Sequence, residues 1–257
     1  MFFCYYISMT FLNIWIFFLG AVVASFLNAT LYRLEKGYKY PQIIKQGSHC
    51  ENCGKALTWW ELIPIIGYIV IKGKCLKCGH KVDPYYPLSE LMLGIMFVLF
   101  FTYSIPWYLW LIVIFLFILS YFDTKQQAVY KDLVHIFLAT TLLFYFLFAF
   151  DVSNLVLPII FSLALIVLNL IKKSFGTADL LILLGLGILI SWQQYLVMFW
   201  LGIMIALLYS LVLIVSKKIA LKGAKIPMIP FYSISFVVTI LYGEEIYAFL
   251  LNFMKIW

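Results

Sequence analysis

Eight long apolar runs divide this chain, and shorter polar segments separate them. The runs cover residues 10–32, 87–104, 106–122, 133–150, 154–171, 178–192, 194–216 and 227–250. About 20 mostly apolar residues are enough for an α-helix to cross the hydrocarbon core of a bilayer. Tight joints between runs, such as the one at residues 104–106, are typical of turns between antiparallel helices. The pattern therefore predicts an all-α polytopic membrane protein with about eight transmembrane helices.

Composition agrees with this prediction and excludes an ordinary soluble domain. Of the 257 residues, 65% are hydrophobic and only 11% are charged, whereas roughly a quarter of the residues in an average soluble domain are charged. The one substantial polar segment covers residues 33–86. We therefore predict a first transmembrane helix within residues 1–32, a small polar domain at 33–86 and a helical bundle at 87–257.

Basic residues occupy alternate loops. Every Lys and Arg except Lys255 follows the first, third, fifth or seventh apolar run. The positive-inside rule then predicts a multi-pass plasma-membrane protein with its N-terminus outside and these loops in the cytoplasm. The net charge of +7 thus needs no nucleic acid to explain it, and no directly bound nucleic acid is expected. Because no Lys or Arg precedes Arg33, the first run is interpreted as a retained span and not as a cleavable signal peptide.

Two matching cysteine units lie in the polar segment. Cys50 pairs with Cys53 and Cys75 with Cys78, and each unit continues with a Gly. Two residues between paired thiolates let both sulfurs reach one ion, and the Gly tolerates a left-handed turn beside them. Four thiolates suit tetrahedral zinc and leave no open position for water, so we predict a structural zinc ion in a cytoplasmic tetracysteine domain.

Other interpretations of the cysteines stay open at this point. Disulfides are disfavoured because the predicted loop lies in the reducing cytoplasm, and a redox motif needs only one pair. His49 and His80 stand beside the cysteines and are alternative ligands. Cys4 lies apart and is interpreted as an incidental apolar residue.

Two aspartates fall at cytoplasmic ends of predicted spans. Asp123 closes the third run and Asp179 opens the sixth, at similar membrane depth. A carboxylate there is expected to face protein or a water-filled cavity. Two carboxylates brought together can share a proton, so that one acts as base toward water and the other as acid toward a peptide carbonyl. Each Asp has a plainer interpretation as a helix cap or interfacial residue, and Asp132 is a third cytoplasmic candidate beside a polar loop.

An ordered set of motifs resembles the type IV prepilin peptidases, which are bifunctional leader peptidases and N-methyltransferases. The resemblance extends over nearly the whole chain and includes enzymes that process competence pseudopilins. The matching segments are residues 25–28 with Arg33, the two cysteine pairs, and residues 60–64, 86–91 and 226–231.

This resemblance implies an enzyme and its substrate. Asp123 and Asp179 are the implied catalytic pair, and the implied substrate is a prepilin or pseudopilin cleaved after a Gly at the cytoplasmic membrane face. Many family members then methylate the new N-terminus with S-adenosylmethionine, but the sequence does not identify residues that bind this cofactor. Glu90, Asn28 and Arg33 lie near span ends and could bind leader, terminus or cofactor, or could cap helices and pair with one another.

Several positions depart from the family pattern. Ala178 replaces the second Gly of the Gly-x-Gly-Asp motif, and Leu181 stands where a Lys is common. Lys131 with Asp132 replaces the usual Pro-Asp, and Ala24 replaces a Gly. A catalytically impaired relative therefore remains an alternative, as do a transporter with proton-relaying aspartates and an assembly protein docked through its zinc loop.

Overall fold

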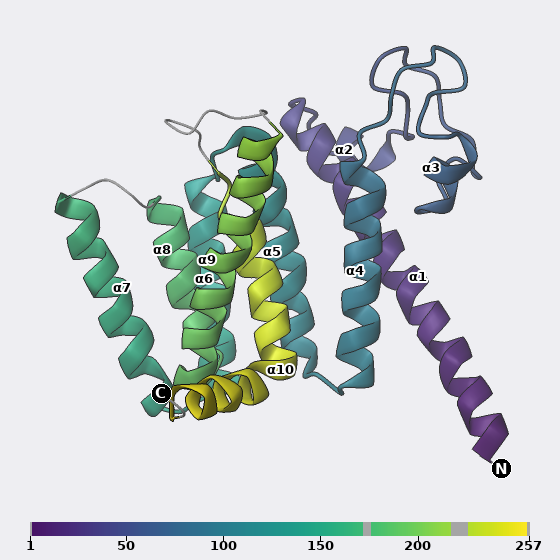
Figure 1. Ribbon diagram of the computed structural model, residues 1–257. Helices are drawn as coiled ribbons and strands as arrows, with labels where there is room; N and C mark the ends of the chain where they lie inside the picture. The colour runs from purple at the N-terminus through teal and green to yellow at the C-terminus, as the bar shows by residue number, and fades with distance from the viewer. Residues whose placement is uncertain (1, 172–175, 217–225, 256–257) are drawn as a thin grey trace. The chain divides into compact units, whose positions relative to one another are not determined.

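The computed structural model describes residues 2–171, 176–216 and 226–255, and within these ranges the chain is built from helices (Figure 1). They are α1 (Phe2–Glu35), α2 (Gln42–Lys45), α3 (Ile66–Val70), α4 (Tyr85–Thr102), α5 (Trp107–Gln126), α6 (Lys131–Phe148), α7 (Ser153–Ile171), α8 (Thr177–Gly187), α9 (Trp192–Val215) and α10 (Ile229–Lys255). The lysines at 172, 173, 217, 218, 222 and 225, which contribute to the predicted orientation, lie outside the described residues.

Six of these helices are long and apolar enough to cross a membrane, and the predicted all-α multi-pass class is confirmed. They are α1, α4, α5, α6, α9 and α10. The other two predicted spans correspond to shorter apolar helices, Leu155–Ile171 within α7 and Thr177–Gly187, which is α8. The count of eight spans therefore stays a prediction. Large apolar side chains such as Trp15, Phe146 and Trp200 are more than half exposed, as expected for surfaces that face lipid.

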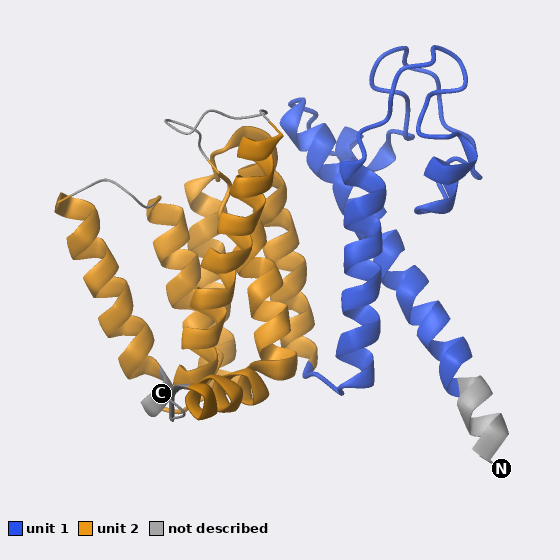
Figure 2. Ribbon diagram, viewed as in Figure 1, with its two compact units in different colours: residues 1–106 blue, residues 107–257 orange. Residues whose placement is uncertain are grey.

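The chain divides into two compact units, Met1–Pro106 and Trp107–Trp257 (Figure 2). In the first unit α1 packs along α4, because small residues let the two backbones approach. A Cβ atom on Gly20 would lie 2.8 Å from the carbonyl oxygen of Leu93, and one on Gly94 would lie 2.8 Å from the ring of Phe17. The segment between these helices carries the cysteines. The predicted domain boundaries at 32/33 and 86/87 stay a prediction.

The second unit is a bundle of α5 to α10. Helix α5 packs on α10, α10 on α9, and α8 on both α6 and α7. The hydroxyls of Ser120 and Ser233, 3.1 Å apart, join α5 to α10. Gly202 lets α9 approach α10, since a Cβ atom there would lie 2.7 Å from the ring of Tyr232. Tyr195 and Tyr232 are fully buried in this core.

Candidate functional sites

Two equivalent turns hold the four cysteines. In the first, the N–H of Cys50 donates to the carbonyl oxygen of Lys55, 2.9 Å away, and Gly54 has a φ of +68°. In the second, the N–H of Cys75 donates to the carbonyl oxygen of His80 at the same distance, and the φ of Gly79 is +70°. Gly adopts such positive φ values at the lowest steric cost. The matching units in the sequence therefore fold into matching turns.

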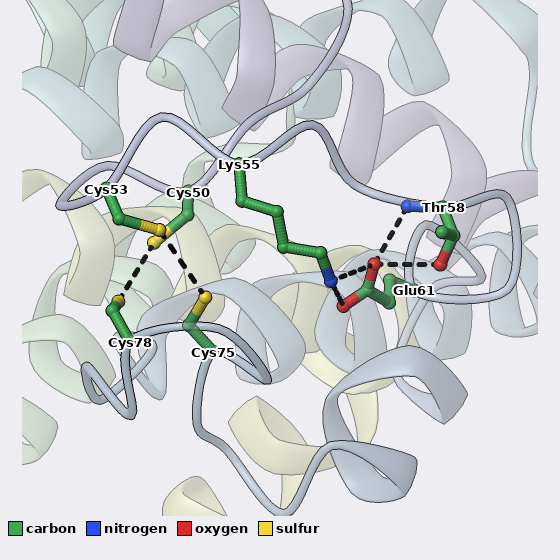
Figure 3. Close-up of polar contacts among 7 residues, drawn as sticks. All are labelled: Cys50, Cys53, Lys55, Thr58, Glu61, Cys75 and Cys78. Atoms are coloured by element: carbon green, nitrogen blue, oxygen red, sulfur yellow. Dashed lines mark hydrogen bonds and ion pairs between the residues drawn. The ribbon is translucent and has the colours of Figure 1, made fainter.

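The four sulfurs form a compact cluster (Figure 3), and all lie within 4.8 Å of one another. The Sγ atoms of Cys50 and Cys78 are 3.8 Å apart, and those of Cys53 and Cys75 are 3.9 Å apart. A zinc ion bound at about 2.3 Å to four sulfurs gives a tetrahedron with edges of about 3.8 Å. A disulfide needs about 2.05 Å, and the four cysteines are free thiols. The cluster therefore fits zinc and not two disulfides.

Backbone amides favour thiolates at part of this cluster. The N–H groups of Cys78 and Lys77 donate to the sulfur of Cys75 and lower its pKa from 9.0 to about 6. The N–H of His80 likewise lowers the pKa of Cys78. At Cys53 a backbone N–H also lowers the pKa, but burial and the other three thiols outweigh it and raise the pKa to about 11. Zinc binds thiolates, so a zinc ion at the centre of the cluster would favour the deprotonated form of all four cysteines.

A salt bridge braces the turn that follows Cys53. Lys55 Nζ lies 2.8 Å from Glu61 Oε1, and the other oxygen of Glu61 accepts from both the N–H and the hydroxyl of Thr58 (Figure 3). The Glu61 side chain is 1% exposed. Burial raises the pKa of Glu61, but hydrogen bonds from Lys55 and Thr58 outweigh burial and lower it. The charged carboxylate thus ties the first cysteine turn to the segment before α3.

Asp123 lies in the last turn of α5. The negative end of a helix disfavours a carboxylate at this position, so another element must stabilise it. The N–H of Ile229, at the start of α10, donates to Asp123 Oδ2 at 3.0 Å, and the N–H of Met228 also donates to this carboxylate. Residues 226–231, which the sequence analysis matched to a family motif without a role, therefore hold Asp123.

Asp179 lies in the first turn of α8, where the positive end of a helix favours a carboxylate. Its Oδ2 accepts from the N–H of Gly176 at 3.2 Å. A Cβ atom on Gly176 would lie only 2.9 Å from that oxygen, so a Gly here leaves room for the carboxylate. Ala178, one of the departures from the family pattern, is the second residue of α8.

The two aspartates line one cavity of about 390 Å³ in the second unit. Asp132 is exposed and lies outside this cavity, whereas Lys131, His135 and Leu181 are part of its wall. His135 was not among the candidate residues predicted from the sequence. The only feature of the sequence that could have indicated its place in the cavity wall is its spacing of four residues, about one helical turn, from Lys131.

A separate polar pocket lies in the first unit, with a volume of about 210 Å³. It contains Asn28, Arg33 and Glu90, which are 2%, 6% and 8% exposed, respectively. These are the three polar groups that the sequence analysis placed near span ends. The structure brings them together around one space and buries all three.

Comparison with known proteins agrees with the motifs. Residues 18–104 match the family model described as "Bacterial Peptidase A24 N-terminal domain". The relative from Myxococcus xanthus, named "Prepilin leader peptidase/N-methyltransferase", is 34% identical over 84 residues, which is 33% of this chain and 24% of the relative. Proteins of the same name from Bacillus subtilis and Stutzerimonas stutzeri are 23% and 25% identical, over 91% and 93% of this chain and 96% and 93% of their own lengths.

The matched segments span only 24%, 35% and 38% of the relatives from Myxococcus xanthus, Neisseria gonorrhoeae and Klebsiella pneumoniae. No solved structure matches the chain. The predicted family resemblance is nevertheless confirmed: residues 18–104 match the model of the Bacterial Peptidase A24 N-terminal domain, and the chain is similar over more than nine tenths of its length to prepilin leader peptidases/N-methyltransferases.

Proposed function

We propose that this chain is a membrane aspartic endopeptidase that removes the leader peptide of type IV prepilins or competence pseudopilins. The observation that carries the proposal is the cavity in the second unit, to which α5 contributes Asp123 and α8 contributes Asp179. The relatives' names support the substrate class. The cavity volume of about 390 Å³ is of the size that binds small ligands or a short peptide segment.

Hydrolysis follows from the two carboxylates. One takes a proton from water while the water oxygen bonds to the scissile carbonyl carbon, and the other donates a proton to the carbonyl oxygen. The carbon–nitrogen bond then breaks, and the leaving nitrogen takes a proton to become the new amino terminus. Separate backbone donors, at Ile229 and at Gly176, orient the two carboxylates. Different surroundings let two aspartates adopt different protonation states.

Orientation brings the substrate to this site. With the basic loops in the cytoplasm, both aspartates lie at the cytoplasmic membrane surface. A prepilin leader is short and basic and precedes a hydrophobic helix, so its cleavage point after a Gly lies at the same depth. The similarity to competence peptidases favours a pilus used in DNA uptake.

Two further features belong to the proposal. The cysteine cluster holds a structural zinc ion in the cytoplasm through Cys50, Cys53, Cys75 and Cys78. The mature amino terminus is then methylated with S-adenosylmethionine, as the relatives' names suggest. When bound, S-adenosylmethionine would supply the methyl group that the terminal nitrogen receives.

The test is cleavage of a co-expressed prepilin, measured as a gel shift. Wild type is expected to cleave, and Asp123→Asn and Asp179→Asn are expected not to, because Asn keeps the size but cannot exchange the proton. Asp132→Asn is the matched control, since Asp132 is exposed outside the cavity, and it should cleave normally. Normal cleavage by either cavity variant would remove that Asp from the mechanism, and an inactive wild type would favour a catalytically impaired relative.

A further inference from the structure

One face of the short helix α3 presents apolar side chains outward. Ile66, Ile69 and Val70 follow the spacing of three and four residues that places side chains on one side of a helix. They are 43%, 65% and 56% exposed, respectively. Gly67 faces the protein instead, since it is buried and a Cβ atom there would lie 2.3 Å from the carbonyl oxygen of Glu61. An exposed apolar face of this kind indicates a surface that is covered by lipid or by another protein.

The turn before α3 adds two more exposed apolar side chains. Trp59 is 77% exposed and Leu62 is 43% exposed, and the N–H of Leu62 donates to the carbonyl oxygen of Trp59 at 3.2 Å. Tryptophan is enriched where a bilayer meets water, because its ring is apolar while its N–H can still bond to headgroups or water. The composition of the segment 59–70 is therefore typical of a structure that lies in a membrane interface.

Hydrogen bonds to α1 and α4 place the start of α3 at the depth of the membrane spans. Ile65, the residue before α3, donates its N–H to Glu90 Oε2 at 2.7 Å, and the Ser25 side chain hydrogen-bonds the same carboxylate. At 1.5 Å per residue, Glu90 lies about 8 Å inside the first turn of α4, and Ser25 lies about 15 Å inside the last turn of α1. The 18 residues of α4 are about 27 Å long, so nearly all of them are needed to cross a hydrocarbon core of about 30 Å.

The position of α3 is also fixed locally. Ile65 has a φ of +64°, a conformation that is rare for a β-branched residue and that persists only where surrounding contacts hold it. The hydrogen bond to Glu90 and the burial of Pro64 supply such contacts. Figure 1 shows α3 level with the first turns of α4. The exposed face of α3 thus lies level with the end of a span and not in the solvent beyond it.

The exposed charges of this segment are positive. Lys72 and Lys74 follow α3 and are both exposed. Glu61, the one acidic residue at 59–74, is 1% exposed and is paired with Lys55. Apolar side chains beside lysines bind anionic lipid surfaces through both burial and electrostatic attraction. The charge therefore favours an anionic lipid surface over a protein partner.

We propose that residues 59–74 dock on the surface of the bilayer, with anionic phospholipid as the partner. The apolar face of α3 enters the boundary between headgroups and acyl chains, and Lys72 and Lys74 contact the anionic headgroups. The second cysteine pair begins at Cys75, directly after this segment, so docking holds the cysteine cluster close to the membrane. The inference goes beyond the proposed function and does not depend on the peptidase or methyl-transfer assignments.

The test is photocross-linking of the full-length chain in nanodiscs made from equal amounts of phosphatidylcholine and phosphatidylglycerol. Ile69→p-benzoylphenylalanine places a photoreactive ring at the most exposed apolar position of α3, and mass spectrometry identifies the lipid in each adduct. Leu76→p-benzoylphenylalanine is the matched control, because Leu76 is 58% exposed but belongs to the second cysteine turn. The yield of lipid adducts at position 69 should be at least tenfold higher than at position 76. Phosphatidylglycerol adducts should outnumber phosphatidylcholine adducts by roughly threefold or more.

A second variant tests the lysines. Lys72→Gln combined with Lys74→Gln should abolish the preference for phosphatidylglycerol at position 69 while the total yield of lipid adducts stays the same. Equal lipid yields at positions 69 and 76, or adducts of position 69 with a protein chain in place of lipid, would overturn the docking surface. A preference for phosphatidylglycerol that survives the double substitution would overturn the role of the lysines. Because all these positions are exposed, the variants should keep the zinc content of wild type, which elemental analysis checks.

Discussion

Replacing Cys75 by Ser is expected to remove zinc from this protein. Two of the sulfur–sulfur distances, 3.8 and 3.9 Å, match the edge of about 3.8 Å expected for four sulfurs around zinc. All four thiolates are therefore placed to bind one ion, and the loss of any one leaves three. Serine keeps the shape of the side chain, but its hydroxyl does not ionise at neutral pH and is a poor ligand for zinc.

The size of the loss follows from the number of ligands. Structural zinc sites bind with an apparent free energy of about 10–16 kcal/mol. Shared among four thiolates, this is about 2.5–4 kcal/mol for each, which corresponds to an affinity about 10²–10³-fold weaker. Cys4→Ser is the matched control, because Cys4 belongs to neither of the paired-cysteine units in the sequence.

Two measurements check this prediction. Elemental analysis of the purified protein should find one zinc per chain in wild type and in Cys4→Ser, and much less in Cys75→Ser. Competition with a chromophoric chelator then gives the affinities. His49→Ala and His80→Ala should keep the ion, because the cluster is complete without either ring. Wild-type zinc content and affinity in Cys75→Ser would refute the tetracysteine site, and loss of zinc in a histidine variant would favour mixed ligation.

Three further outcomes are expected. Gly67→Ala places a Cβ atom 2.3 Å from the carbonyl oxygen of Glu61. The variant should therefore destabilise the first unit by about 1–3 kcal/mol, measured by denaturant unfolding. Gly47→Ala is the control and should leave the stability unchanged, because a Cβ atom there meets nothing within 4 Å. Glu61→Gln should lower the melting temperature at pH 7. The pKa of Glu61 is lowered in the folded chain, so the charged carboxylate stabilises the fold above the ordinary pKa of 4.5, and this stabilisation is lost as the pH falls through the folded pKa. If the difference in melting temperature between Glu61→Gln and wild type were the same at pH 3 as at pH 7, that result would argue against the Lys55 salt bridge. Lys131→Glu adds a third carboxylate to the cavity wall and should slow prepilin cleavage about fivefold, which corresponds to roughly 1 kcal/mol. The control Lys131→Arg should cleave at the wild-type rate. If Lys131→Glu also cleaved at the wild-type rate, the charge at this position would not act on the site.

The four-cysteine cluster could be predicted from the sequence because its geometry is local. A pair of cysteines two residues apart, followed by Gly54 or Gly79, specifies its own turn, and only the meeting of two such turns depends on the rest of the fold. Helices were also predictable, because apolar runs of this length have few other structures available in a bilayer. The end of α8 was less well predicted. The apolar run extends to residue 192, but the helix ends at Gly187.

A local signal for the start of the next helix was present in the sequence. Ser191 accepts from the N–H of Gln194 at 3.3 Å, and the Gln194 side chain accepts from the N–H of Ser191 at 3.1 Å. This reciprocal pair of hydrogen bonds is a capping box. A Ser that is followed three residues later by a Gln predicts this motif. It begins α9 at Trp192.

The carboxylate surroundings could not be predicted in this way. Asp123 and Asp179 are far apart in the chain, so their placement in one cavity depends on how α5, α8 and α10 pack. The donor to Asp123 is a backbone N–H at Ile229, which no side-chain motif reveals.

The central claim is that Asp123 and Asp179 act as one catalytic unit, and a double-mutant cycle on the cleavage rate tests it most directly. Wild type, Asp123→Asn, Asp179→Asn and the double variant would be compared with the same prepilin in the same detergent. Each single variant should lose about 10²–10⁴-fold in rate, and the double variant should be no slower than the slower single variant, because a unit already broken cannot be broken again. Losses that multiply in the double variant, or a single variant that cleaves at the wild-type rate, would contradict the account.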